Sequence, residues 1–285
     1  MSRLSAAERA LQLTTVCCGL LVAAMLVLML VLAWPLLHSG QLLSLIGGDW
    51  QPAAGRYGIA PMLAASLLLA ISAVLLAIPL SLGTAFAAVA LAPPFLRSPL
   101  MLCVRLMAGI PTVIYGFAAV FALVPLMRQW IGSGSGFTLL TATLVLAVLI
   151  APTMIVFFVG GLRAVPQGYS LAADALGCRP VDKLLYLLLP QAAPAITAGI
   201  VMGLGRALGD TMIGLMLAGN SAIMPDSMLS TGRTLTSHIA LVIAADFSSM
   251  EFKSIFACGI VLYLLTAALV AILRRTLPLP ATARP

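Results

Sequence analysis

The chain has 285 residues, of which 62% are hydrophobic and 8% are charged, and its mean hydropathy is +1.16. In soluble domains about a quarter of the residues are charged, so this composition excludes an ordinary soluble domain and predicts a polytopic membrane protein. The formal net charge of +7 is then assigned to basic residues that flank membrane spans on the cytoplasmic side. Nucleic-acid binding is not expected.

Apolar runs predict an all-α fold with six transmembrane helices. In chain order they cover residues 13–37, 59–91, 99–127, 137–162, 194–219 and 254–272. The first run is too long for the core of a signal peptide, so it is expected to remain as a span. Pro79 and Gly83 predict a kink in the second run. The sequence GIPTVIYG at residues 109–116 interrupts the third run, either as a packing kink or as part of a transport pathway.

Basic residues near the ends of these runs are unevenly distributed. One side carries Arg3, Arg9, Arg97, Arg105, Arg163, Arg179, Lys183, Arg274, Arg275 and Arg284, and the other carries Arg56, Arg128, Arg233 and Lys253. Basic residues beside membrane spans face the cytoplasm, so both termini are expected there. The predicted organisation is a cytoplasmic tail at residues 1–12, a transmembrane domain at 13–275 with a cytoplasmic loop at 164–190, and a second tail at 276–285.

Two charged residues interrupt the apolar segment at residues 199–220. On a helix, Gly199, Gly203, Arg206 and Asp210 would share one narrow face, so that face is expected to meet protein or water and not lipid. Charges inside a membrane are costly unless they are paired or hydrated, and they commonly mark functional sites. Arg206 and Asp210 are therefore predicted to lie close enough to pair, either as a structural ion pair or as a substrate-binding or gating site.

No sequence motif for catalysis is visible in the chain. It has no phosphate-binding GxxxxGK[ST], HExxH, paired CxxC or nucleophile-elbow sequence, so energy for any active process must come from a partner. His38 and His238 are too few for a histidine-built metal site and are interpreted as residues at loop ends. The five cysteines show no metal-binding spacing and are expected to be reduced thiols.

The sequence LAADALGCRPVDKLLYLLLP, residues 171–190, resembles the cytoplasmic EAA loop of ABC importer permeases. The matching positions are Ala172, Ala173, Gly177, Leu187, Leu189 and Pro190, and Leu171 stands where that family usually has Glu. Gly177 would permit a sharp turn between two short helices, whose apolar side chains could enter a groove on a soluble ATPase. The alternative is a helix lying in the bilayer interface.

Two further segments narrow this resemblance. Residues 206–220, RALGDTMIGLMLAGN, and residues 233–240, RTLTSHIA, are similar to segments of phosphate-specific importer permeases, and of their C-type subunit in particular. Asp210 replaces the Glu of that family, which keeps the charge. The resemblance implies a type I permease fold in the bacterial inner membrane and transport of inorganic phosphate through one half of a pore.

The same resemblance implies the partners of the chain. They are an A-type permease, a cytoplasmic ATPase dimer that uses ATP and Mg²⁺, an extracytoplasmic phosphate-binding protein, and membrane lipid. The chain itself is expected to bind no cofactor and no metal. Three alternatives stay open: a permease for another oxyanion such as molybdate or sulfate, an ion-coupled secondary transporter in which Arg206 and Asp210 relay protons, and a membrane scaffold that transports nothing.

Overall fold

The computed structural model describes residues 6–38, 46–132, 134–247 and 249–276, and its main elements are α-helices. The long helices are α1 (Ala6–His38), α3 (Ala60–Phe86), α4 (Pro94–Gly109), α5 (Thr112–Ile131), α6 (Leu139–Ala164), α9 (Leu189–Gly209) and α12 (Met250–Thr276). The shorter helices are α7 (Gln167–Ala175), α8 (Pro180–Asp182), α10 (Met212–Leu217) and α11 (Leu235–Val242), with π-helical turns η2 (Ala87–Leu91) and η3 (Lys183–Leu188). A hairpin of β1 (Trp50–Gln51) and β2 (Arg56–Tyr57) encloses the 3-10 turn η1 (Pro52–Ala54).

Six helical segments in the described part of the chain are long and apolar enough to cross a membrane. They are Ala10–Trp34, Ala60–Leu91, Thr112–Ile131, Leu139–Ala164, Pro180–Gly209 and Met250–Ile272. The predicted all-α fold with six spans is therefore confirmed. The first of these segments begins at Ala10, and α1 itself is helical from Ala6. Residues 277–285 of the second predicted tail lie outside the described residues.

Two predicted spans were wrong in their boundaries. The third, predicted as one helix at residues 99–127, is divided into α4 and α5, because Pro111 disfavours helical geometry at Ile110, whose backbone is extended. The fifth was predicted at residues 194–219. Its helical run instead begins at Pro180, passes through η3 into α9, and ends at Gly209.

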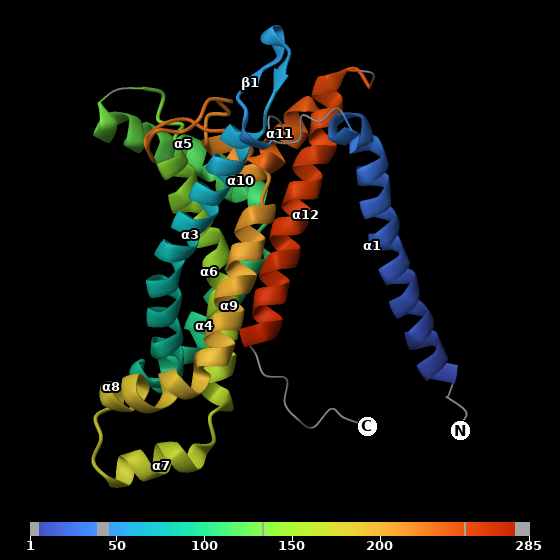
Figure 1. Cartoon of the computed structure of the whole chain (residues 1–285). Coiled ribbons are helices and arrows are strands. Elements are labelled where there is room, and N and C mark those ends of the chain that lie inside the picture. The colour runs from blue at the N-terminus through green and yellow to red at the C-terminus, as the bar shows by residue number, and fades with distance from the viewer. Residues whose placement is uncertain (1–5, 39–45, 133, 248, 277–285) are drawn as a thin grey trace.

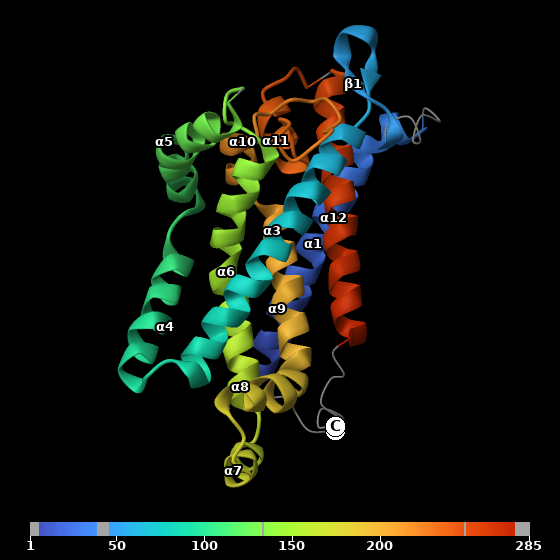
Figure 2. The same ribbon diagram turned by 90° about the vertical axis from the view of Figure 1, so that its left-hand side faces the viewer.

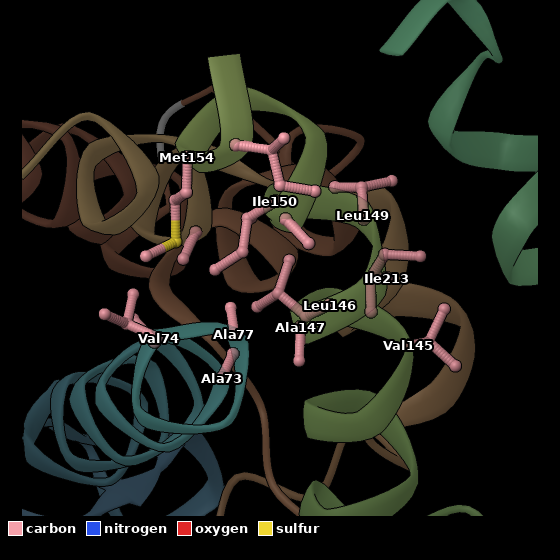
Figure 3. Close-up of a cluster of buried hydrophobic side chains, with 14 of the residues drawn as sticks. Ala73, Val74, Ala77, Val145, Leu146, Ala147, Leu149, Ile150, Met154 and Ile213 are labelled. Atoms are coloured by element: carbon pink, nitrogen blue, oxygen red, sulfur yellow. The ribbon is translucent and has the colours of Figure 1, made fainter. Parts of the chain in front are cut away.

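The core of the bundle is α6, which packs between α3 and α9. Figure 3 shows Ala73 and Ala77 of α3 facing Leu146, Ala147 and Ile150 of α6. Lipid tails are as apolar as leucine, so helices in a membrane associate through close packing of small residues and through hydrogen bonds between them. Both are present here.

Small and polar residues bring the three central helices together. A Cβ added to Gly199 would lie 2.8 Å from the Phe158 ring, and one added to Gly203 would lie 2.9 Å from the Met154 side chain. These contacts confirm that the glycine face of α9 meets protein. Ser72 and Thr143 join α3 to α6 with a 3.1 Å hydrogen bond between their hydroxyl groups.

The bundle has two different ends. Figure 1 shows α7 and α8 at one end, together with the first turn of α1 and the last turn of α12. The hairpin, α10 and α11 lie at the opposite end (Figures 1 and 2). α1 stands apart from α6 and contacts α12, where Met29 lies against Gly259. We refer below to the α7 end and the hairpin end.

Candidate functional site

Asp210 lies at a break in the helix and not on the face of α9. The helix ends at Gly209, and the backbone of Asp210 is extended, with φ −74° and ψ 120°. Its carboxylate oxygen Oδ1, one residue before the N-cap Thr211, accepts a 2.8 Å hydrogen bond from the backbone N–H of Ile213 in the first turn of α10. Asp at such a position satisfies a backbone donor that the first helical turn leaves free. The prediction that Asp210 continues one helical face was therefore wrong.

Arg206 is in the last turn of α9 and is half-buried. Its Nη1 donates a 2.7 Å hydrogen bond to Oγ1 of Thr153, which follows Pro152 in α6. Arg206 interacts electrostatically with Asp210 and with Tyr115 of α5, but no Arg206 nitrogen lies within the 4.0 Å of an Asp210 oxygen that defines an ion pair. The predicted close pair is therefore absent, because the chain turns away from the helix axis at Gly209.

The GIPTVIYG segment brings α5 beside this break. Tyr115 donates a 2.9 Å hydrogen bond from its hydroxyl to the carbonyl of Met107, across the junction of α4 and α5. A Cβ added to Gly116 would meet the sulfur of Met216 in α10 at 2.6 Å. The segment is thus a helix break whose second half packs on α10, and Tyr115 lies within electrostatic reach of Arg206.

A cluster of hydroxyl groups fixes the break from the other side. Thr234 caps α11 by accepting a hydrogen bond from the N–H of Ser237, and both side chains lie against Gly214 of α10. Thr236 donates a 3.0 Å hydrogen bond to the backbone carbonyl of Asp210. Since the carbonyl of Asp210 lies outside a helix, this bond supplies a partner for it.

The sequence segments 206–220 and 233–240 meet at the Gly219–Asn220 turn. Gly219 and Asn220 have φ of 84° and 56°, a region that glycine and asparagine adopt more readily than other residues. The N–H of Gly232 donates to the carbonyl of Ala218 at 2.8 Å, and Nε of Arg233 donates to the carbonyl of Asn220 at 3.0 Å. Neither this turn nor its closure by Arg233 was predicted from the sequence.

His238 was predicted to be a loop-end residue, and this was wrong. It lies in α11 with no exposed surface, and its ring meets the ring of Trp50 edge to face at a centroid distance of 4.4 Å. Its Nε2 is 3.4 Å from the hydroxyl of Ser254 in α12. Burial, and to a lesser extent the charge of Arg233, lower the pKa of His238 to about 4. His238 therefore joins the hairpin to α11 and α12 as a neutral side chain. His38 is the last residue of α1.

At the α7 end, Gly177 makes the sharp turn that its sequence position predicts. Its φ is 71°. The N–H of Cys178 donates to the carbonyl of Ala173 at 3.1 Å, and that of Gly177 donates to the carbonyl of Asp174 at 3.0 Å. This pair of bonds is a Schellman motif, which requires a left-handed residue directly after the helix and strongly favours glycine there. Ala172 and Leu171 precede the turn in α7, and Leu171 is 67% exposed.

The second half of the EAA-like loop differs from the prediction. Leu187, Leu189 and Pro190 do not belong to a separate short helix, because α8, η3 and α9 form one helical run. Figure 1 shows α8 lying across the end of the bundle before α9 rises through it. An ion pair between Lys183 and Asp174, 2.7 Å from Nζ to Oδ1, links this run back to α7.

Metal binding finds no support among the described residues, which contain no group of three His, Cys, Asp or Glu side chains able to hold an ion. None of the five cysteines forms a disulfide in the structure.

Comparison with known proteins agrees with these features. Residues 77–278 match the family described as binding-protein-dependent transport system inner membrane component. The chain is 33% identical over 248 residues to the phosphate transport system permease protein PstC of Xylella fastidiosa, covering 79% of this chain and 75% of that one. It is 30% identical over 274 residues to PstC of Pasteurella multocida, covering 90% and 85%.

Solved structures share the fold at lower identity. The inward-facing methionine ABC transporter MetNI superposes with a TM-score of 0.61 at 18% identity, over 80% of this chain and 99% of that one. A bacterial ABC transporter that imports alginate gives 0.58 at 15% identity, over 94% and 98%. The fold is thus that of type I ABC importer permeases, and the chain belongs to the family of inner membrane components of binding-protein-dependent transport systems.

Proposed function

We propose that this chain is the C-type permease of an ATP-driven importer of inorganic phosphate. Two relatives that it matches over most of its length are named phosphate transport permeases. The assignment of phosphate as the substrate rests on Arg206, whose half-buried guanidinium lies within a membrane span. It donates a hydrogen bond to the neutral hydroxyl of Thr153, and no carboxylate lies within ion-pair distance of it. Its remaining N–H donors suit a phosphate oxyanion, which guanidinium binds through paired hydrogen bonds.

Asp210 has a separate part in this proposal. Its carboxylate fixes the start of α10, and its charge acts on Arg206 from beyond ion-pair distance. A nearby negative charge limits how tightly Arg206 holds an anion, and transport requires that the anion also leaves. Asp210 is thus proposed to gate release, and Arg206 to contact the substrate in passing.

In this proposal the partner ATPase drives transport by acting on the α7 end. The permease family works with an ATPase, and ATP and Mg²⁺ belong to that partner. We propose that the ATPase dimer contacts α7 and the turn at Gly177, and that the movement passes along the helical run Pro180–Gly209 to Arg206. The other proposed partners are an A-type permease, which completes the pore, and an extracytoplasmic phosphate-binding protein at the hairpin end.

In this proposal the α7 end faces the cytoplasm, and both chain termini are expected there as well. In a background without other cysteines, a cysteine in place of Gln167 should then be shielded from an impermeant thiol reagent in intact cells, whereas one in place of Ser135 should react. Labelling of the cysteine at position 167 from outside would contradict the orientation.

The function is tested by reconstituting the chain with its copurified partners and measuring uptake of radiolabelled phosphate, sulfate and molybdate with and without ATP. We expect ATP-dependent accumulation of phosphate alone. Accumulation of sulfate or molybdate instead would assign another oxyanion. Uptake that needs no ATP and stops when a protonophore is added would assign a secondary transporter, and no uptake of any anion would favour a scaffold.

A further inference from the structure

A basic cavity lies at the α7 end, away from Arg206 and the break after α9. Its volume is about 450 Å³, and it is lined by Pro94, Arg97, Ser98, Met101, Leu102 and Arg105 of α4 and by Arg163 of α6. Figure 2 shows the beginning of α4 at the same level as α8, near the lower end of α6. The three arginines come from two helices, and no acidic side chain is among the lining residues.

Local structure explains why the arginines converge. Arg97, Met101 and Arg105 follow one another at intervals of four residues, so they lie on one face of α4. Arg163 is in the last turn of α6, two residues after the tightly packed Gly161, whose added Cβ would meet Ala195 of α9. The end of α6 is therefore held in place while its arginine faces the cavity.

Arg97 is fixed before any ligand arrives. Its Nε donates a 2.8 Å hydrogen bond to the carbonyl of Ala92, and its Nη2 donates a 3.0 Å hydrogen bond to the carbonyl of Ala90. These bonds satisfy carbonyls at the end of η2 and leave the other N–H donors of the guanidinium available. A guanidinium that is already ordered loses less conformational entropy when it binds an anion.

The positive charges around the cavity favour the binding of an anion. Three like charges that share one cavity repel each other, and the lining supplies no carboxylate to offset them. The first turn of α4 adds to this field, because its N-cap residue Pro93 makes no side-chain cap and the helix dipole is positive there. Met101 and Leu102 add apolar side chains to the lining beside the charges.

From this geometry we propose that the cavity binds a phosphate group, supplied either by the headgroup of an anionic lipid or by inorganic phosphate in the cytoplasm. Basic pockets between helices on the cytoplasmic side of membrane proteins suit such headgroups, and the cytoplasmic position of this cavity rests on the proposed function. A bound phosphate group joins α4 to the end of α6, which is separated from α7 by Val165 and Pro166 alone. The ligand would thus stabilise the segment from which α7 projects. This site does not depend on which anion the protein transports.

The test uses the full chain with its copurified partners and compares two double variants. Arg105→Gln with Arg163→Gln removes two exposed arginines of the cavity and leaves Arg97 with its backbone bonds. Arg56→Gln with Arg128→Gln removes two exposed arginines of β2 and of the last turn of α5, neither of which lines the cavity, and is the matched control. The lipid arm measures phosphatidylglycerol retained against phosphatidylethanolamine by native mass spectrometry. The phosphate arm measures equilibrium binding of radiolabelled inorganic phosphate in phosphatidylcholine nanodiscs, with the phosphate-binding protein removed and with Arg206→Gln in every variant.

We expect the cavity variant to lose at least about tenfold in affinity in one arm, because each lost guanidinium removes a charge-assisted hydrogen bond. The control should match the unmodified protein. Loss in the lipid arm identifies a headgroup as the source, and loss in the phosphate arm identifies inorganic phosphate. If the two double variants behave alike in both arms, the cavity does not bind a phosphate group and the proposal is overturned.

Discussion

Polar groups find partners within the chain at the Gly209 end of the helical run Pro180–Gly209, whereas large apolar side chains stay exposed at its Pro180 end. Asp210, Thr236 and Arg233 all make hydrogen bonds to backbone groups of this chain. By contrast, Leu176 and Tyr186 at the α7 end are 83% and 81% exposed. The first region is held together by hydrogen bonds within this chain, although Asn220 Oδ1 and His238 Nδ1 are buried there without a hydrogen-bond partner. The second presents the kind of surface that a partner protein covers.

Gly177→Val tests whether the α7 end depends on the shape of its turn. A β-branched residue with φ of 71° is strained, so the turn should open or shift. We expect ATP-dependent uptake to fall by about tenfold or more while the protein still inserts, since a misplaced contact removes coupling. Gly168→Val is the control. Gly168 lies in α7, the helix that precedes the Gly177 turn, with open space around it and no positive φ. Equal uptake by both variants would show that the turn does not couple the ATPase.

The pH dependence of stability tests whether neutral His238 holds the hairpin end together. The pKa of its imidazole is about 4 in the fold against an ordinary value of 6.5, so the fold binds fewer protons than the unfolded chain. Its contribution to stability is fully present above pH 6.5 and is lost as pH falls towards 4. The loss corresponds to roughly 3 kcal/mol. Thermal unfolding across this interval should show a weaker acid dependence for His238→Gln. An unchanged dependence would mean that protonation of His238 has no effect on the hairpin end.

Substitutions of Asp210 distinguish the effect of its hydrogen bond to α10 from the effect of its charge. Asp210→Ala removes the acceptor for the N–H of Ile213 and should lower the free energy of unfolding by about 1 kcal/mol. Asp210→Asn keeps a side-chain oxygen at that position and should leave stability within a few tenths of a kcal/mol. Thermal unfolding of both variants in detergent checks this. Equal destabilisation by Ala and Asn would indicate that the charge, and not the cap, holds the break.

Leu171 should give the smallest effect. It is 67% exposed and stands at the position where the EAA loop usually has Glu, so Leu171→Glu introduces no buried charge. We expect unchanged stability, because surface substitutions alter the free energy of unfolding by a few tenths of a kcal/mol. ATP-dependent uptake should change by no more than about twofold. A large loss of uptake would show that this chain contacts its ATPase through an apolar residue at that position.

The parts of the fold that follow from local sequence could be predicted. Apolar length identified six spans, and the position of Gly177 in the EAA-like pattern indicated the turn. The predicted glycine face at Gly199 and Gly203 also proved correct, because only small residues permit such close approach to Phe158 and Met154. These features depend on residues near one another in the chain or on one helical face.

The remaining features depend on contacts between distant segments. The helical periodicity of the sequence predicted a helix that continues through Asp210. In the structure its carboxylate instead accepts a hydrogen bond from the first turn of α10, and Thr236 of the later helix α11 donates to its carbonyl. His238 looked like a loop residue because nothing in its local sequence shows that Trp50 covers it. The convergence of Arg105 and Arg163 likewise required the packing of α4 beside α6.

The central claim is that Arg206 serves the transported anion and not a structural ion pair. ATP-dependent phosphate uptake in reconstituted vesicles should be measured for Arg206→Gln, Asp210→Asn and the variant that carries both, with Arg206→Lys as the charge-preserving control. We expect Arg206→Gln to abolish uptake, Arg206→Lys to rescue it poorly because it lacks the planar donor fork, and the double variant to stay inactive. Recovery of uptake in the double variant would contradict the claim, because removing both members of a structural pair relieves the penalty that removing one creates.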